Sequence, residues 1–278
     1  MSFSAEWLAL REPFDLQARH PGVLRHAAAA LSGQPSVTIV DLACGTGSTL
    51  RALGPHLAMR QSWRLFDNDL SLLARVPPAA NLHVQPLDLV TDLEAALDGP
   101  VDLVTTSALL DLVSADWLKR LVMEVAARRL PIYAALSYDG RVDFAPTHSR
   151  DAAIIAAVNS HQRRDKGFGP ALGPIAARTA AEQLEKLGYA VELGAADWRL
   201  RETDLAMQEA LLAGWAAAAT ETGEISAEAA AKWLLSRRAA LRANRSTIRV
   251  GHIDLFASPA DARRVDRSQS NSTSSPSR

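Results

Sequence analysis

The chain has 278 residues, of which 48% are hydrophobic and 22% are charged. This length and apolar content allow a large buried core, which excludes collagen-like, coiled-coil and wholly disordered classes. Thirty basic and 31 acidic residues give a net charge of −1, which disfavours a strongly basic nucleic-acid surface. The single cysteine, Cys44, excludes an intramolecular disulfide and a cysteine-cluster zinc site.

The sequence shows neither a secretory signal pattern nor a membrane-spanning apolar run. Its N-terminus has no basic segment followed by an apolar one, as a secretory signal would have. No run of about 18 uncharged apolar residues occurs, and the Ala-rich run 206–219 is interrupted by polar residues. These features predict a cytoplasmic protein that is not embedded in a membrane.

The first half of the chain alternates between strand and helix patterns. Residues 1–36 read as an N-terminal helical lid segment, which precedes a β-branched run at 37–41. This run ends in a glycine-rich turn that opens a helix at 48–57. Further strands are predicted at 63–66, 82–87, 101–106 and 131–136, with helical segments between them. Near-continuous apolar strands separated by helices are typical of a parallel sheet covered on both faces.

The second half is less regular. It predicts helices at 150–160, 175–187, 204–220 and 227–242, and strands at 189–200 and 248–256. The predicted fold is therefore α/β: a doubly wound, mostly parallel seven-stranded sheet with helices on both faces. Its main domain is 37–257, with a substrate-side insertion at 138–173 after the fifth strand and a helical insertion at 202–244 between the last two. The Ser/Arg-rich tail 258–278 is predicted to be disordered, because its composition buries little apolar surface.

One motif carries most of the chemical information. Asp41-Leu-Ala-Cys-Gly-Thr-Gly47 ends a strand and opens a helix. Glycines there let the backbone approach a ligand closely, and the helix N-terminus presents free N–H groups. Asp67 ends the second strand, 20 residues after Gly47, where its carboxylate can accept hydrogen bonds from a ribose diol. Dinucleotide enzymes and adenosyl-ligand enzymes both use this arrangement.

The spacing of the glycines separates these two ligand classes. Leu50 occupies the position at which the dinucleotide fingerprint G-x-G-x-x-G has its third glycine. A phosphate-binding P-loop is excluded because no lysine follows the glycines. Asp41, just before the turn, suits a ligand with an amino group better than a pyrophosphate. The pattern therefore favours an adenosyl ligand.

These residues resemble motif I of the class I (Rossmann-like) S-adenosylmethionine (SAM)-dependent methyltransferases. Residues 67–70 resemble the acidic loop that follows that motif, 87–89 resemble the acid of the third strand, and 101–110 resemble the fourth strand and its loop. The strands at 189 and 248 fit the antiparallel pair that marks this fold. The resemblance covers 37–256 and implies SAM as methyl donor, S-adenosylhomocysteine (SAH) as product, and no metal.

The resemblance also implies the residues that hold the cofactor. They are Asp41, Ala43, Gly45, Gly47, Asp67, Asn68, Asp88, Leu89 and Ser107. Asp41, Gly45 and Gly47 would hold the methionine part, Asp67 would bind the ribose hydroxyls, and Asp88 and Leu89 would flank the adenine. Ala43 departs from the family pattern, because many members have glycine there.

Substrate residues are expected after the fifth strand, since ligands of such folds bind beyond the carboxyl ends of the strands. The candidates for a base or orienting group are Tyr138, His148 and His161, and the candidates for substrate binding are Arg163, Lys166 and Asp139. The alternative is a solvated charged loop. In the N-terminal segment, Arg11 or Arg19 could meet the methionine carboxylate, or could equally be surface charges.

The predicted function is methyl transfer from SAM to a small polar or anionic metabolite by in-line displacement. The loop 107–112 lacks the Asn/Asp-Pro-Pro-aromatic motif of many methyltransferases that act on nucleobases or glutamine. One alternative is an RNA or protein methyltransferase that uses the arginine-rich stretch 237–249. Another is a SAM-binding protein without catalysis. The sequence leaves open which atom is methylated, whether a base is used, and the oligomeric state.

Overall fold

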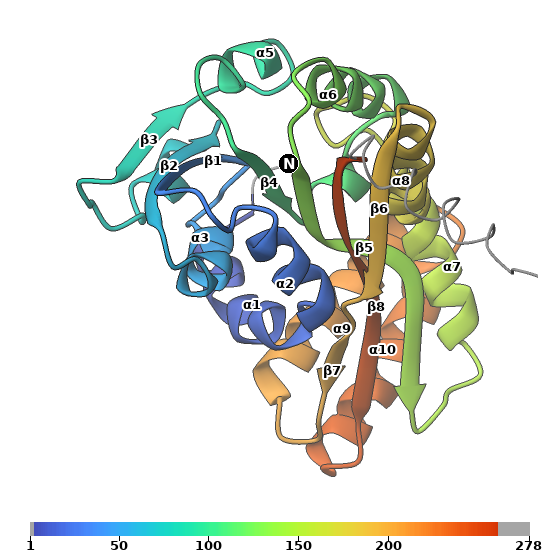
Figure 1. The fold of residues 1–278 in the computed structure, drawn as a ribbon. Coiled ribbons are helices and arrows are strands. Elements are labelled where there is room, and N and C mark those ends of the chain that lie inside the picture. Colours follow the sequence, from blue (N-terminus) through green and yellow to red (C-terminus); the bar gives the residue numbers. More distant parts are fainter. Residues whose placement is uncertain (1–2, 261–278) are drawn as a thin grey trace, which may run out of the picture.

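A computed structural model describes residues 3–260 and places a twisted sheet at the centre of the molecule (Figure 1). Within these residues the sheet has eight strands in the order β3-β2-β1-β4-β5-β8-β6, and β7 also pairs with β8. The strands are β1 (Ser36–Leu42), β2 (Arg60–Asp67), β3 (Leu82–Pro86), β4 (Leu103–Ser107), β5 (Ile132–Ala145), β6 (Tyr189–Ala195), β7 (Trp198–Leu200) and β8 (Thr247–Pro259).

The direction of the strands confirms the predicted fold class. Strands β1 to β5 run parallel to one another, whereas β8 is antiparallel to β5, β6 and β7. The strand order reverses at β1, which lies between β2 and β4, and this switch point is where doubly wound sheets bind ligands. The count differs from the predicted seven because 189–200 divides into β6 and β7, which pair with β8 in one continuous register.

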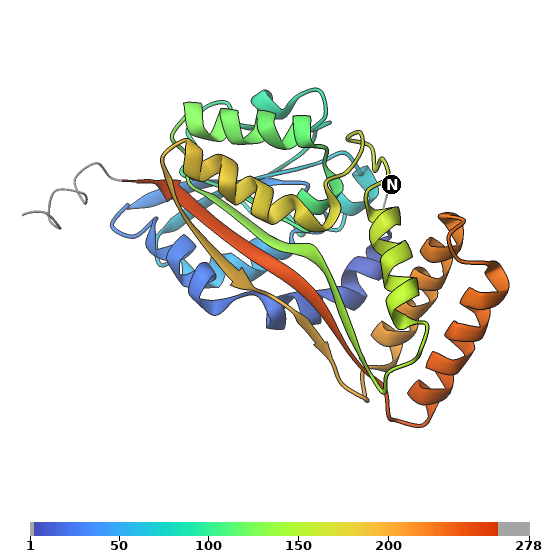
Figure 2. The same ribbon diagram turned by 90° about the vertical axis from the view of Figure 1, so that its right-hand side faces the viewer.

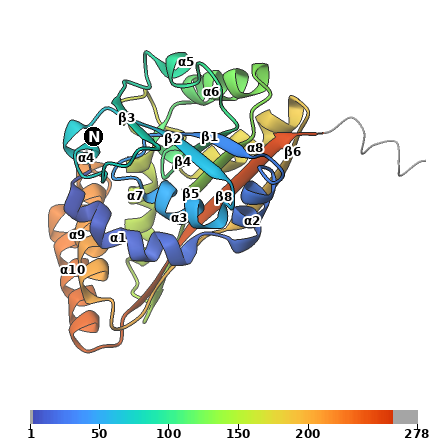
Figure 3. The same ribbon diagram turned by 60° about the vertical axis from the view of Figure 1, so that its left-hand side comes forward.

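Helices cover both faces of the sheet (Figures 2 and 3). The α-helices are α1 (Ala5–Ala18), α2 (Pro21–Ala29), α3 (Ser48–Leu53), α4 (Leu70–Leu73), α5 (Leu93–Ala96), α6 (Ala115–Ala127), α7 (Asp151–Gln162), α8 (Ala176–Lys186), α9 (Leu205–Glu221) and α10 (Ala227–Arg242). Short 3-10 turns are η1 (Gly54–His56), η2 (Leu110–Leu112) and η3 (Gly173–Ile175). No helix in the described part of the chain is both long enough and apolar enough to cross a membrane.

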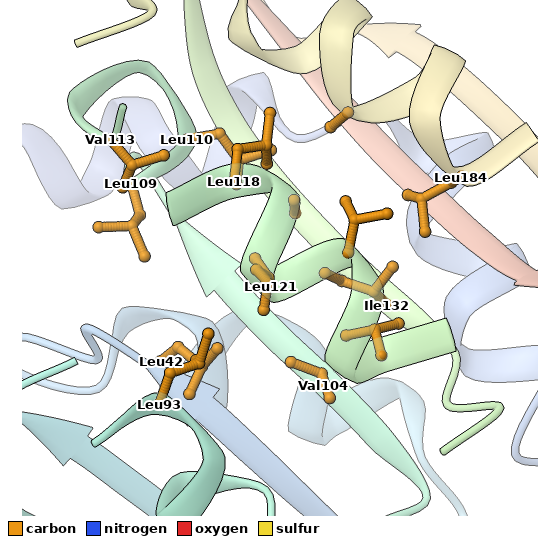
Figure 4. Close-up of a cluster of buried hydrophobic side chains, with 14 of the residues drawn as sticks. Leu42, Leu93, Val104, Leu109, Leu110, Val113, Leu118, Leu121, Ile132 and Leu184 are labelled. Atoms are coloured by element: carbon orange, nitrogen blue, oxygen red, sulfur yellow. The ribbon is translucent and has the colours of Figure 1, made fainter. Parts of the chain in front are cut away.

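Two apolar clusters hold these layers together. On one face, α5, α6 and α8 pack on β1, β4, β5 and β8. Figure 4 shows part of this cluster, in which Leu118 and Leu121 of α6 gather with Val104 of β4. Helix α6 follows its N-cap Ser114, whose side chain accepts the Trp117 N–H. On the opposite face, α2 and α3 pack on β1 and β2.

The long ribbon of β5 and β8 extends beyond this three-layer core (Figure 2). β5 bends at Leu136, where φ is +55°, and then continues pairing with β8 as far as Ala145. The predicted insertion 138–173 thus begins as a strand rather than as a loop. Helices α7, α9 and α10 pack against this ribbon in a third apolar cluster. Helices α9 and α10 fall within the predicted insertion 202–244.

The predicted disordered tail falls mostly outside the part that the structure describes. Residues 261–278 are not described, so their disorder stays a prediction. The predicted start of the tail at 258 is two residues too early, because β8 runs to Pro259. The last residues of β8 pair with the start of β6, where Pro259 lies opposite Tyr189.

A buried ion pair fixes α10 against α7. Arg237 is 2% exposed, and its guanidinium pairs with Asp151 and donates to the Pro146 carbonyl at 2.6 Å. Trp233 Nε1 also donates to Asp151, at 2.8 Å. Removing the cation would leave the carboxylate desolvated and uncompensated, whereas exposed pairs contribute little.

We therefore expect Arg237→Ala to lower the free energy of unfolding by about 3 kcal/mol or more in urea denaturation. The neighbouring Arg238→Ala removes a half-exposed pair with Glu209 and should lower the free energy of unfolding far less. Equal losses in the two variants would contradict this interpretation of the ion pair.

Candidate functional site

The turn between β1 and α3 has the backbone that the motif predicts. Ala43, Gly45 and Gly47 all have positive φ values, of 53°, 55° and 84°. The Cys44 N–H donates to the Phe66 carbonyl at 2.9 Å, which ties the turn to the end of β2. A residue with a Cβ is strained in this left-handed region by about 1–2 kcal/mol. That strain is the physical reason for the glycine preference at the position of Ala43.

Asp67 connects the turn to the next strand. Its carboxylate accepts the Gly45 N–H at 2.8 Å with one oxygen and the Asp69 N–H at 3.0 Å with the other. Each carboxylate oxygen can accept two hydrogen bonds, so each retains capacity for a ligand. Asp67 also lines a cavity above the turn. The side chain is therefore held in place by two backbone amides while it faces this space.

This first cavity has a volume of about 270 Å³ and lies beyond the carboxyl ends of β1, β2 and β4. Most of the predicted cofactor residues line it: Ala43, Gly45, Asp67, Asn68, Asp88, Leu89 and Ser107. At the end near β3, the Val90 N–H donates to the Asp88 carboxylate at 2.9 Å. A Cβ on Gly45 would lie 3.2 Å from Leu8 Cδ1, so a larger residue would crowd the cavity from below.

Two of the predicted cofactor residues are not among those lining this cavity. Gly47 is the N-cap of α3. Asp41 is fully buried below the turn, where Oδ1 accepts the Thr105 hydroxyl at 2.8 Å. Its other oxygen has no hydrogen-bond partner among the described residues. Burial raises the pKa of Asp41 to about 7.

Both arginines of the N-terminal segment are buried, so neither is a surface charge. Arg11 on α1 forms an ion pair with Asp15, with Nε 2.9 Å from Oδ2, and it lines the first cavity. Arg19 lies at the end of α1 and donates to the Tyr133 hydroxyl at 3.3 Å and to Ser107 Oγ at 3.4 Å. Of the two, Arg11 is the one that faces ligand space.

A second cavity, of about 510 Å³, adjoins the first. Five residues line both: Phe3, Arg11, Ala108, Leu112 and Lys166. The second cavity lies between α1, the bent part of the β5–β8 ribbon, α7 and α9. Two adjoining cavities of this kind can hold two reactants next to each other.

Aromatic rings form much of the wall of the second cavity. The centroid of the Trp198 ring lies 6.5 Å from that of Trp7 and 4.6 Å from that of His252. The Arg11 guanidinium carbon lies 4.9 Å from the Trp198 centroid. Tyr138 is 6.1 Å from His252. Burial lowers the pKa of His252 to about 3, so its imidazole is neutral at physiological pH.

Three of the predicted substrate residues come together at this cavity. Tyr138, His161 and Lys166 all line it. The Tyr138 hydroxyl donates to Asn159 Oδ1 at 2.8 Å, and burial raises its pKa. His161 contacts two charged side chains. Its Nε2 lies 3.0 Å from Glu221 Oε2, and its Nδ1 lies 3.3 Å from Lys166 Nζ.

The other three lie elsewhere, so the geometry does not support the predicted substrate roles of His148, Arg163 and Asp139. Asp139 forms an ion pair with Arg141 on the ribbon. His148 follows the end of β5, where its N–H donates to Asp151. Arg163 is exposed at the end of α7. For Asp139 and His148 the reason is the length of β5, which runs to Ala145 and leads the chain away from the cavities.

Asp111 is a residue that sequence reasoning missed. It lies in η2, directly after β4, and lines the second cavity. It is 5% exposed, and Oδ1 has no hydrogen-bond partner in residues 3–260. Burial raises its pKa to about 6. A lone carboxylate within the apolar run Leu109–Leu112, at a strand end, was the signal that could have revealed it.

The arginine-rich stretch does not form a continuous basic face. Arg237 pairs with Asp151, Arg238 with Glu209, and Arg249 with Asp197. These three arginines therefore neutralise carboxylates of the protein itself, which gives no support to the hypothesis of an RNA-binding helix.

Comparisons with known proteins give similarity of structure only. No protein-family model and no curated protein sequence matches the chain. The cyclopropane synthase MmaA2 from Mycobacterium tuberculosis is 12% identical, with a TM-score of 0.48 over 92% of this chain and 94% of that one. A SAM-dependent methyltransferase from Thiobacillus denitrificans, solved with SAH, is 15% identical, with a TM-score of 0.44 over 93% and 100% of the two chains. Similarity at this level does not establish a shared activity, so the function depends on the site's own residues.

Proposed function

We propose that this chain is a SAM-dependent methyltransferase that acts on a small-molecule acceptor. The observation that carries the proposal is Asp67. Its carboxylate is fixed by the Gly45 amide at the switch point of the sheet and faces a cavity that adjoins a second one. A carboxylate in this place suits a ribose diol, and the second cavity suits an acceptor.

The residues present fit an adenosyl ligand. Asp67 would accept hydrogen bonds from the ribose hydroxyls, and Leu72, Leu87 and Leu89 offer apolar contact to the adenine. Arg11 provides a cation in the same cavity for the carboxylate of the methionine part. When bound, SAM supplies an electrophilic methyl group. The protein's contribution is then mainly to hold the acceptor in line with that group, which can provide several kcal/mol.

The second cavity supports a small acceptor. Its volume of about 510 Å³ lies in the range of small-molecule sites. The sequence predicts a polar or anionic acceptor, and His161 and Lys166 could contact a polar or anionic group. Of the predicted anchors, Arg163 and Asp139 lie outside, so we propose one polar group on an otherwise apolar molecule rather than a highly charged metabolite.

The cofactor class is testable by thermal unfolding. SAH at about 100 times its Kd should stabilise the folded protein by about 2.7 kcal/mol, because it binds only the folded state. NAD at the same concentration should leave the melting temperature unchanged, since Leu50 replaces the third glycine of the dinucleotide fingerprint. A shift with NAD and none with SAH would refute the proposal.

The role of Asp67 is testable by calorimetry with SAH. We expect Asp67→Asn to weaken binding about tenfold or more, because hydrogen bonds to a charged group contribute about 1.5–3 kcal/mol. Asp98→Asn changes an exposed carboxylate that is 3.8 Å from Arg128 and should bind as the wild type does. Equal affinity in both variants would mean that the ribose site is elsewhere.

A further inference from the structure

We propose that Asp111 is the catalytic base of this site. We further propose that the second cavity takes a ring-sized, mainly apolar molecule with a single hydroxyl group as the methyl acceptor. This inference rests on the function proposed above, and it names the acceptor class and the residue that takes the acceptor's proton.

The position of Asp111 is the first argument. The loop after β4 forms the junction of the two cavities, because Ala108 and Leu112 line both. Asp111 lies between these two residues in sequence and opens into the second cavity. A group at this junction is close to where the two reactants would meet.

The unpaired oxygen of Asp111 is the second argument. The carboxylate interacts with the backbone amides of Asp111 and Tyr138, but Oδ1 is buried without a partner among the residues described. A buried charged acceptor that lacks a donor destabilises the protein, because the hydrogen bonds it made to water are lost and not replaced. A hydroxyl group of a bound ligand would supply this hydrogen bond.

The walls of the cavity define the rest of the ligand. Much of the lining of this cavity consists of rings and aliphatic side chains from α1, α7, β7, α9 and β8. These are Trp7, Val158, Trp198, Leu211, Trp215 and Val250. Flat rings favour a flat partner, because aromatic groups stack or meet edge to face. The body of the acceptor should therefore be apolar and ring-shaped.

The nearby charges favour a neutral hydroxyl over a protonated amine. The Arg11 guanidinium acts electrostatically on Asp111, and Lys166 lines the same cavity. An ammonium group at Asp111 would bring a further positive charge into a cavity that already holds Lys166 and Arg11, the latter paired with Asp15. A hydroxyl donates a hydrogen bond to the carboxylate without carrying charge into this field.

The reaction then balances without a further reactant. The acceptor oxygen forms a bond to the methyl carbon of the sulfonium donor, and the carbon–sulfur bond breaks with its electron pair remaining on sulfur. The hydroxyl proton passes to Asp111 Oδ1 and later to water. Burial raises the pKa of Asp111 to about 6, so the carboxylate is ionised at neutral pH but more basic than an exposed aspartate.

Other titratable or charged groups that line this cavity come from each surrounding element. They are Arg11 of α1, Tyr138 of β5, His161 of α7, Lys166 of the following loop, Glu221 of α9 and His252 of β8. Burial raises the pKa of Tyr138 and lowers that of His252 to about 3. Neither of these two changes charge between pH 5 and 8, so His161→Gln is the control for the other histidine of this cavity.

The first test is calorimetric binding without cofactor, using 2-naphthol and its methyl ether 2-methoxynaphthalene as probes. We expect the wild-type protein to bind 2-naphthol about tenfold more tightly than the ether at pH 8. This preference should decline at pH 5, where Asp111 is protonated, and the decline should persist in His161→Gln whatever that variant's absolute affinity for the two probes. In Asp111→Leu it should fall to about twofold or less while the ether still binds, which also shows that this variant is folded.

The second test is transfer from SAM to 2-naphthol. Asp111→Asn keeps the shape and an acceptor oxygen but cannot take a proton, so we expect kcat to fall about 100-fold or more with little change in KM. Asp116→Asn on the adjacent α6 removes an exposed carboxylate and should have wild-type rates.

Several outcomes would overturn the proposal: neither probe binds, both bind equally, or Asp111→Asn transfers at the wild-type rate. Absence of transfer when SAH and 2-naphthol both bind would refute the hydroxyl acceptor. Loss of the SAH-induced thermal shift concerns the proposed function instead, because the naphthalene probes need no cofactor.

Discussion

The arrangement of both cavities depends on one buried carboxylate, Asp254 of β8. It accepts the Leu136 N–H at 2.8 Å, the His20 N–H at 2.9 Å and the Tyr133 hydroxyl at 3.2 Å. These contacts join three parts of the chain: the bend of β5, the corner between α1 and α2, and the middle of the sheet. Because hydrogen bonds to a buried charge are strong and costly to leave unmade, this junction fixes α1 over the sheet. Leu8 and Arg11 are thereby held above the glycine-rich turn.

The bend of β5 at Leu136, which Asp254 holds in place, also separates the core of the sheet from the β5–β8 ribbon. Before Leu136, β5 is a core strand between β4 and β8, on the side of the first cavity. After it, the same strand runs out with β8 as a ribbon whose near part carries Tyr138 and His252 and whose far part carries α7, α9 and α10. The ion pair of Arg237 with Asp151 fixes α10 to α7, and α7 and α9 in turn form the outer wall of the second cavity. The position of that wall is therefore set by contacts far from the reacting groups.

This division explains how much the sequence could predict. The turn and Asp67 were predictable, because strand, turn and helix follow one another locally and the carboxyl ends of adjacent parallel strands must meet at one edge. The second cavity was not, because its wall combines α1, α7, α9 and the two ribbon strands, whose pairing is invisible to local patterns. Residues 138–145 contain Gly140 and three charges and resemble a loop, yet they form a strand because β8 lies beside them. His148 was consequently expected near the site and lies beyond the ribbon's end.

Two buried acids near the switch point lower the stability of the folded protein. Asp41 lies near the end of β1 and Asp111 follows β4, and each retains an oxygen without a partner in the described region. Burial raises their pKa values to about 7 and about 6, from an unfolded value near 4. A raised pKa means that the folded state binds protons more tightly than the unfolded state, so these acids destabilise the fold as the pH rises from about 4 to about 7. Hydrophobic replacements of similar size would avoid this cost, as they do for other buried charged groups. At Asp111, the acid faces the space that an acceptor would occupy, so a bound donor can recover the loss, and part of the binding free energy of the acceptor comes from satisfying a group that the unliganded fold leaves unsatisfied.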